Sequence, residues 1–101
     1  MLKIGICDDE LLVQKQIGNI ISGYLSNKKY TYELFFYSKG YDLLEDCNHM
    51  DFSFIFLDID LGKENGVNIA KAIRSIQNKP INIVFVTSYP EYQTKVLSIH
   101  T

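Results

Sequence analysis

Three short polar clusters in this chain carry side chains that can do chemistry, and each comes at the end of an apolar run. They are Asp8 with Asp9, Asp58 with Asp60, and Thr87 with Ser88. Carboxylates that lie a few ångströms apart repel one another, and a hard divalent cation such as Mg²⁺ relieves that repulsion. A carboxylate beside such a cation can attack phosphorus directly, because it is already ionised and needs no general base. The residue types therefore predict a magnesium and phosphoryl site.

The apolar runs that precede these clusters are typical of short strands. Residues 54–57 (FIFL) are aromatic and β-branched, as expected of a strand buried on both faces. Residues 2–7 and 81–86 are similarly apolar, and residues 30–37 add an aromatic, strand-favouring run. The sequence therefore predicts four strands.

Helical patterns lie between and after these strands. Residues 10–25, 41–46 and 67–77 carry apolar side chains at helical spacing, and a last helix is predicted around Tyr92, Val96 and Ile99, with Pro90 in its first turn. In the first helix the predicted apolar stripe is Leu11, Ile17, Ile20, Ile21, Tyr24 and Leu25.

Two local features are predicted at the ends of these helices. Asp9 is the expected N-cap of the first helix, with Glu10 in its first turn, where an acid is favourable. The pair Asn65 and Gly66 suits a turn that needs a positive φ.

The alternation of strands and helices predicts an α/β fold with a doubly wound, flavodoxin-like parallel sheet of strand order 2-1-3-4. In that order the first and third strands are neighbours, and all carboxyl ends point the same way. Ligands of open α/β sheets bind in the crevice beyond those ends. Asp8, Asp58 and Thr87 are therefore expected to meet in one crevice.

Composition narrows the class of protein. The 101 residues carry 10 basic and 12 acidic side chains, a net charge of −2, so no nucleic-acid footprint is expected from this segment. No apolar run approaches the roughly 18 residues that span a bilayer, and no signal peptide is recognised, so a cytoplasmic protein without membrane contact is predicted. Cys7 and Cys47 have no metal-ligand spacing and are predicted to be reduced, buried residues.

The motifs together resemble a known family. CDDE at 7–10, FLDIDLG followed by NG within 56–66, and VTS at 86–88 are similar to the receiver domain of two-component response regulators. The resemblance runs across all 101 residues and is strongest to regulators that carry a LytTR-type DNA-binding domain.

The resemblance implies a role for each candidate residue. Asp58 would be the phosphoacceptor, and Asp8, Asp9 and Asp58 would hold Mg²⁺. Asp60 would offer its backbone carbonyl to the metal, and Thr87 would supply the switch hydroxyl. The domain would signal rather than act as an enzyme: a sensor histidine kinase would phosphorylate it, and DNA would be bound only through a separate output domain.

The sequence departs from the family at its end. Receivers similar to this one continue into a fifth strand and fifth helix, with a Lys that pairs with the phosphoryl group, whereas only 14 residues follow Thr87 and Lys95 is no obvious substitute. Residues 1–101 are therefore predicted to form an incomplete receiver. The bare edge of the fourth strand is expected to favour a homodimer or strand exchange.

Two other readings remain open. Asp58-Ile59-Asp60 and Thr87 also resemble the motifs of haloacid dehalogenase-like phosphatases, which work through an aspartyl phosphate and Mg²⁺. Asp8 and Asp9 would have no role there, and the Lys and later acidic pair of that family have no candidates. The third reading is a pseudo-receiver that is not phosphorylated and acts as a protein interaction module.

Overall fold

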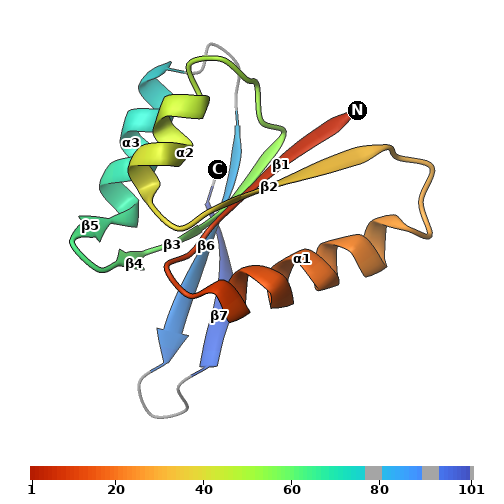
Figure 1. Ribbon diagram of the computed structural model, residues 1–101, viewed down its shortest axis with the longest axis horizontal. Coiled ribbons are helices and arrows are strands. Elements are labelled where there is room, and N and C mark those ends of the chain that lie inside the picture. Colours follow the sequence, from red (N-terminus) through yellow and green to blue (C-terminus); the bar gives the residue numbers. More distant parts are fainter. Residues whose placement is uncertain (77–80, 90–93, 101) are drawn as a thin grey trace.

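A five-stranded sheet with helices on both faces forms the centre of the molecule (Figure 1). The computed structural model describes residues 1–76, 81–89 and 94–100. Its elements are β1 (Leu2–Cys7), α1 (Leu11–Leu25), β2 (Tyr32–Tyr37), α2 (Gly40–Asp46), β3 (Phe54–Asp58), β4 (Asp60–Leu61), β5 (Glu64–Asn65), α3 (Gly66–Ile76), β6 (Asn82–Tyr89) and β7 (Thr94–His100). The short strands β4 and β5 form a separate hairpin that the sequence did not predict.

The parallel part of the sheet has the predicted topology. Its strands lie in the order β2-β1-β3-β6, and all three neighbouring pairs are parallel. This is the flavodoxin-like order 2-1-3-4 with β6 as the fourth strand, so that prediction is confirmed.

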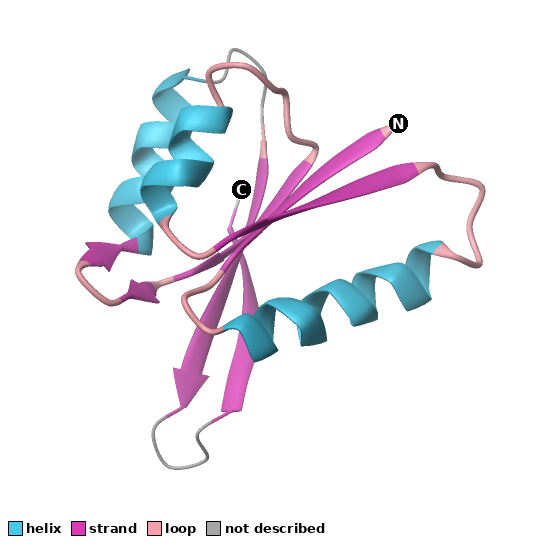
Figure 2. Cartoon of the chain, viewed as in Figure 1, coloured by secondary structure: helices cyan, strands magenta, loops and turns pink. Residues whose placement is uncertain are grey.

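The predicted last helix is wrong for residues 94–100, which form strand β7 and pair antiparallel with β6 (Figure 2). The pairing runs from Ile83 opposite His100 to Tyr89 opposite Thr94. Three apolar residues at helical spacing are a weak signal, and pairing with β6 satisfies backbone groups that a bare edge would expose. Residues 90–93, with Pro90 and Tyr92, lie outside the described residues.

The pairing with β7 also corrects two related expectations. The edge of β6 is not bare, so strand exchange through that edge loses its structural basis. In addition, β6 extends three residues beyond the predicted end at Val86, which places Thr87 and Ser88 within a strand rather than after one.

The core consists of two layers, one on each face of the sheet. On one face α1 packs over the sheet, and on the other α2 and α3 lie side by side (Figure 1). Alternate residues of each strand serve the two layers: Ile4 and Ile6 of β1 join the α1 layer, whereas Ile55 and Leu57 of β3 join the α2 and α3 layer. Both faces of the central strands are therefore covered.

The buried stripe of α1 is narrower than predicted. Ile17, Ile21 and Leu25 are buried, but Leu11, Ile20 and Tyr24 are about two thirds exposed. Ile20 and Tyr24 form one side of an open apolar groove of about 320 Å³ between α1 and strands β1 and β3. None of the helices in the described residues is both long enough and apolar enough to cross a bilayer.

Gly66 is required for close packing and not for a positive φ, which corrects the prediction for the Asn65-Gly66 pair. The positive φ, +75°, belongs to Gly62. Gly66 opens α3, and a Cβ atom there would collide with the carbonyl oxygen of Asp58 and lie 2.8 Å from Cα of Ile59. A residue larger than glycine would therefore push α3 away from the end of β3.

We expect Gly66→Ala to lower the free energy of unfolding by about 2–4 kcal/mol, because backbone atoms on both sides would have to move. Gly23→Ala is the matched control: it lies in α1 with nothing within 4 Å of the added Cβ. It should raise stability by about 0.5–1 kcal/mol through helix propensity. Urea unfolding followed by circular dichroism measures both, and equal effects of the two variants would contradict the close-packing argument.

The core also contains a thiol with an altered pKa. Cys47 is buried and forms no disulfide, and burial, together with the nearby charge of Asp46, raises its pKa from 9.0 to about 11. The unfolded chain would lose this proton at lower pH than the folded chain, so this residue's contribution to stability is complete below pH 9 and is lost as the pH rises through 11. The raised pKa therefore adds to the loss of stability at alkaline pH.

We expect Cys47→Ala to weaken the dependence of unfolding free energy on pH between 9 and 11, whatever its effect at neutral pH. Chemical denaturation at several pH values measures that slope. An identical slope in the variant and the parent protein would show that the buried thiol does not contribute to the dependence of unfolding free energy on pH.

Candidate functional site

The register of β1 and β3 places two carboxylates side by side. The last matched pair of these parallel strands is Cys7 with Leu57, and the next residue on each side is an aspartate: Asp58 ends β3, and Asp8 directly follows β1. Side chains alternate along a strand, so adjacent residues in this register face the same way. Both aspartates are buried, with 0% and 1% of their surface exposed. The structure thus brings together the first two predicted site residues.

Backbone N–H groups support both carboxylates. The N–H of Glu10 donates to Oδ1 of Asp8 at 2.9 Å, and the N–H of Asp60 donates to Oδ1 of Asp58 at 3.1 Å. Each donor lies two residues further along the chain, so the turn after each strand folds back over its own carboxylate. Such bonds favour the ionised form of a carboxyl group, which is the form that binds metals or attacks phosphorus.

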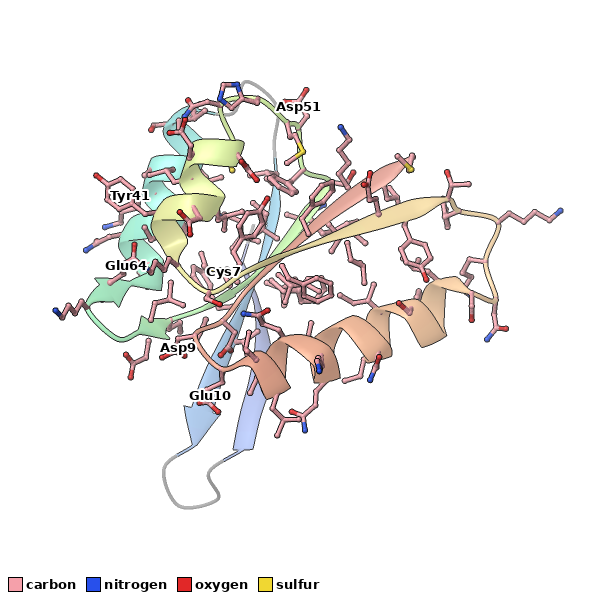
Figure 3. The ribbon with its side chains drawn as sticks, in the orientation of Figure 1. Cys7, Asp9, Glu10, Tyr41, Asp51 and Glu64 are labelled. Atoms are coloured by element: carbon pink, nitrogen blue, oxygen red, sulfur yellow. The ribbon has the colours of Figure 1, made fainter. Side chains whose placement is uncertain are left out.

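Three acidic side chains at the end of β1 suit a hard cation. Carboxylate oxygens of Asp8, Asp9 and Glu10 all lie within 4.8 Å of one another, with Asp8 buried and the other two exposed. Figure 3 shows Asp9 and Glu10 where β1 leads into α1. Oxygen ligands of this kind fit Mg²⁺ or Ca²⁺. The sequence predicted Asp8, Asp9 and Asp58 as side-chain ligands; this group contains the first two together with Glu10, which was not predicted.

The predicted N-cap at Asp9 is wrong. Glu10 occupies that position, with extended backbone and no hydrogen bond from its side chain to the helix, and α1 begins at Leu11 without an acidic residue in its first turn. The reason is that the turn over Asp8 uses one more residue before the helix starts. Neither Asp9 nor Glu10 is therefore occupied in capping α1.

We call the group of Asp8, Asp9, Glu10 and Asp58 the acidic pocket. The backbone of Asp60 and of Thr87 lies next to Asp58. The Asp60 side chain is exposed and its Oδ1 accepts a hydrogen bond from the N–H of Gly62 at 3.2 Å. Thr87 follows Val86, whose carbonyl oxygen accepts from the N–H of Ile59 at 3.2 Å, just past Asp58. The proposed roles of the Asp60 carbonyl and the Thr87 hydroxyl remain predictions.

Cys7 lies among the carboxylates of this end of the sheet. Burial first, and then the charges of Glu64, Asp8, Asp58 and Asp42 in that order, raise its pKa from 9.0 to about 12. The thiol therefore keeps its proton at neutral pH. Its surroundings indicate that acidic groups from four segments of the chain create a negative potential here.

Gln14 was missed by the sequence analysis, although it holds two of the pocket loops. It is a buried residue of α1, and its Nε2 donates to the carbonyl oxygens of Asp8 at 2.7 Å and Tyr37 at 3.1 Å. The hydroxyl of Ser38 lies 3.2 Å from the same nitrogen. A polar residue on the buried face of an amphipathic helix was the signal that could have identified it.

Glu64 was also missed, and it holds a third loop. Its two carboxylate oxygens accept hydrogen bonds from the first backbone N–H groups of α2, at Gly40 and Tyr41. The sequence carries no signal for this contact, because the partners are more than 20 residues apart and Glu64 reads as an ordinary loop acid.

We expect Gln14→Leu to lower the free energy of unfolding by about 2–3 kcal/mol, since buried carbonyl groups of two loops would lose a donor. Gln16→Leu, on the exposed face of the same helix, should change it by less than about 0.5 kcal/mol. Urea titration of both variants tests this, and a Gln14→Leu protein as stable as Gln16→Leu would contradict it.

Comparison with known proteins identifies relatives. Residues 4–100 match the response regulator receiver domain. The chain is 29% identical over 99 residues to sensory transduction protein LytT of Bacillus subtilis (strain 168), which covers 98% of this chain and 39% of LytT. It is 33% identical over 94 residues to accessory gene regulator protein A of Staphylococcus aureus (strain N315), which covers 89% of this chain and 39% of that protein. The chain therefore spans about two fifths of these relatives.

A solved structure of another response regulator is also similar to this chain. Response regulator protein TrrA of Thermotoga maritima, in complex with Mg²⁺ and BeF, is similar with a TM-score of 0.65 and 25% identity, covering 92% of this chain and 75% of that one. The resemblance seen in the acidic and hydroxyl motifs thus extends to the strand order and to nearly the whole length of the chain. The chain belongs to the response regulator receiver domain family.

Proposed function

We propose that this chain is a phosphoacceptor in two-component signalling and that Asp58 receives the phosphoryl group from a phosphohistidine of a sensor histidine kinase. The observation that carries the proposal is the pair of buried carboxylates, Asp8 and Asp58, side by side at the carboxyl ends of neighbouring parallel strands. A structural role alone gives no reason to bury two like charges together, because the arrangement is costly without a cation.

The chemistry is a direct displacement at phosphorus. A carboxylate oxygen of Asp58 forms the new O–P bond while the N–P bond of the phosphohistidine breaks, and its electron pair stays on the imidazole nitrogen. Asp58 needs no base because it attacks as the anion. The N–H of Asp60 holds the carboxylate in place by its hydrogen bond.

The acidic residues at the end of β1 would hold the metal. Asp8 and Asp9, with Glu10 nearby, would supply oxygen ligands. The carboxylate of Asp58 and the backbone carbonyl of Asp60 are the further ligands we propose. When bound, Mg²⁺ neutralises the charge of the carboxylates and of the incoming phosphoryl oxygens. The Mg²⁺ and BeF in the TrrA complex support this choice of metal.

Phosphorylation would act through conformation. A phosphoryl group adds about −1.5 to −2 charge at Asp58 and would attract donors such as the hydroxyl of Thr87, rearranging the loops after β3 and β6. We propose that this change reaches an output segment beyond residues 1–101, through which DNA would be bound, and that the protein is cytoplasmic. The length of LytT, of which the match covers 39%, supports such a segment.

We expect incubation with acetyl phosphate and Mg²⁺ to add one phosphoryl group, measured as intact mass. Asp58→Asn should remove the adduct, and so should omission of the metal. Asp51→Asn is the matched control: it removes the charge of an exposed carboxylate that precedes β3, at the opposite end of that strand from Asp58, and should leave labelling intact.

The other outcomes separate the competing functions. Sustained hydrolysis of a generic phosphate ester that depends on both Asp58 and Asp60 would favour a phosphatase. The absence of any adduct on a folded chain that binds Mg²⁺ would favour a pseudo-receiver that acts as an interaction module.

A further inference from the structure

Glu64 joins two segments that are distant in the sequence. Its Oε1 accepts a hydrogen bond from the N–H of Gly40 at 2.9 Å, and its Oε2 accepts one from the N–H of Tyr41 at 3.0 Å. Both donors belong to the first turn of α2, whereas Glu64 lies on β5, in the loop that follows Asp58. Figure 3 shows Glu64 and Tyr41 together on the α2 and α3 side of the sheet.

The β4–β5 hairpin needs an anchor of this kind. Each of its strands has two residues, paired as Asp60 with Asn65 and Leu61 with Glu64. A hairpin this small is not stable on its own. Its position must therefore come from contacts with the rest of the molecule.

One end of the hairpin is tied directly to the acidic pocket. The N–H of Asp60 on β4 donates to Oδ1 of Asp58, and after β5 the N–H of Gly66 donates to the carbonyl oxygen of Ile59 at 2.7 Å. A displacement of the hairpin would therefore move the donor that orients the phosphoacceptor carboxylate.

The other partner, α2, is firmly packed. A Cβ on Gly40 would lie 2.7 Å from Cγ1 of Ile69 on α3 and 3.3 Å from Cδ1 of Leu61 on β4, so the start of α2 fits closely against both elements. Leu43 in the same helix is fully buried. The first turn of α2 thus offers two fixed donors at a fixed place.

We propose that Glu64 is a positioning residue of the acidic pocket: by binding the first two N–H groups of α2, it fixes the hairpin and thereby the Asp60 N–H that orients Asp58. The inference rests on the proposed function for its consequence in phosphoryl transfer. Glu64 touches no reacting atom, so its effect passes through Asp60.

Charge and positioning predict different results for substitutions of Glu64. Glu64→Gln and Glu64→Ala both remove one negative charge near the pocket, so an effect of charge alone would be equal in the two variants. The amide oxygen of Gln can still accept a hydrogen bond from α2, whereas Ala accepts none. If Glu64 acts by positioning, the Gln variant should therefore keep the Asp60 N–H largely in place, whereas the Ala variant should not.

The experiment measures solvent exchange of the Asp60 amide proton by NMR in the ¹⁵N-labelled chain without metal. We expect exchange about tenfold faster in Glu64→Ala than in the parent protein, and within about threefold of it in Glu64→Gln. Glu45→Ala, which removes an exposed acid from α2 itself, is the control and should leave the Asp60 amide unchanged.

Exchange of Asp60 that is the same in the parent protein and Glu64→Ala would overturn the inference, and so would equal rates in the Ala and Gln variants. If Glu64→Ala does not fold, the comparison moves to Glu64→Gln: Asp60 exchange should rise about twofold to threefold, and no change would overturn the inference.

A titration of the same samples with Mg²⁺ distinguishes a failure of the inference about Glu64 from a failure of the proposed function. We expect affinity to decrease from the parent protein to Glu64→Gln and then to Glu64→Ala, by about tenfold in all. A parent protein that takes no Mg²⁺ and no phosphoryl group would refute the proposed function, while the metal-free response of Asp60 would still decide the role of Glu64.

Discussion

The constraint on which the rest of the structure depends is the burial of two carboxylates at neighbouring positions. Asp58 ends β3 and Asp8 directly follows β1, each one position beyond the last matched pair of the two strands, and both side chains are buried. Desolvation and mutual repulsion both oppose this placement. The turns after β1 and β3 offset part of that cost by folding a backbone N–H over each carboxylate, at Glu10 and Asp60. Burying these two carboxylates is thus locally unfavourable, and the free energy gained by packing the layers on both faces of the sheet offsets it.

Contacts from both faces hold the loops around these carboxylates. On the α1 face, Gln14 joins the ends of β1 and β2 through their carbonyl groups. On the other face, Glu64 joins the loop after β3 to the start of α2. Both are single polar side chains that bind backbone atoms of another segment. A rearrangement of the loop after Asp58 would therefore reach α2 through Glu64, and a change at Asp8 would reach α1 through Gln14.

Where the structure differs from the local sequence pattern, tertiary contacts decided the conformation of a segment or the burial of its side chains. Residues 94–100 carry helical spacing, yet they pair with β6, because an available strand edge offers hydrogen bonds that a short helix with a weak apolar stripe does not outweigh. The buried stripe of α1 is narrower than the sequence pattern predicts, because Ile20 and Tyr24 border an open groove instead of entering the core. In both cases the neighbouring elements, and not the local sequence pattern, decided the conformation or the burial of the residues.

The sequence by itself determined the parallel order of β2, β1, β3 and β6, because apolar runs that alternate with amphipathic helices leave few other arrangements. The motifs around Asp8, Asp58 and Thr87 indicated the family. Only the tertiary structure decided which polar groups hold the pocket. Gln14 and Glu64 act on backbone atoms of distant segments, and such contacts follow no sequence spacing. They arise only when the packing of the sheet and helices brings those backbone groups within reach.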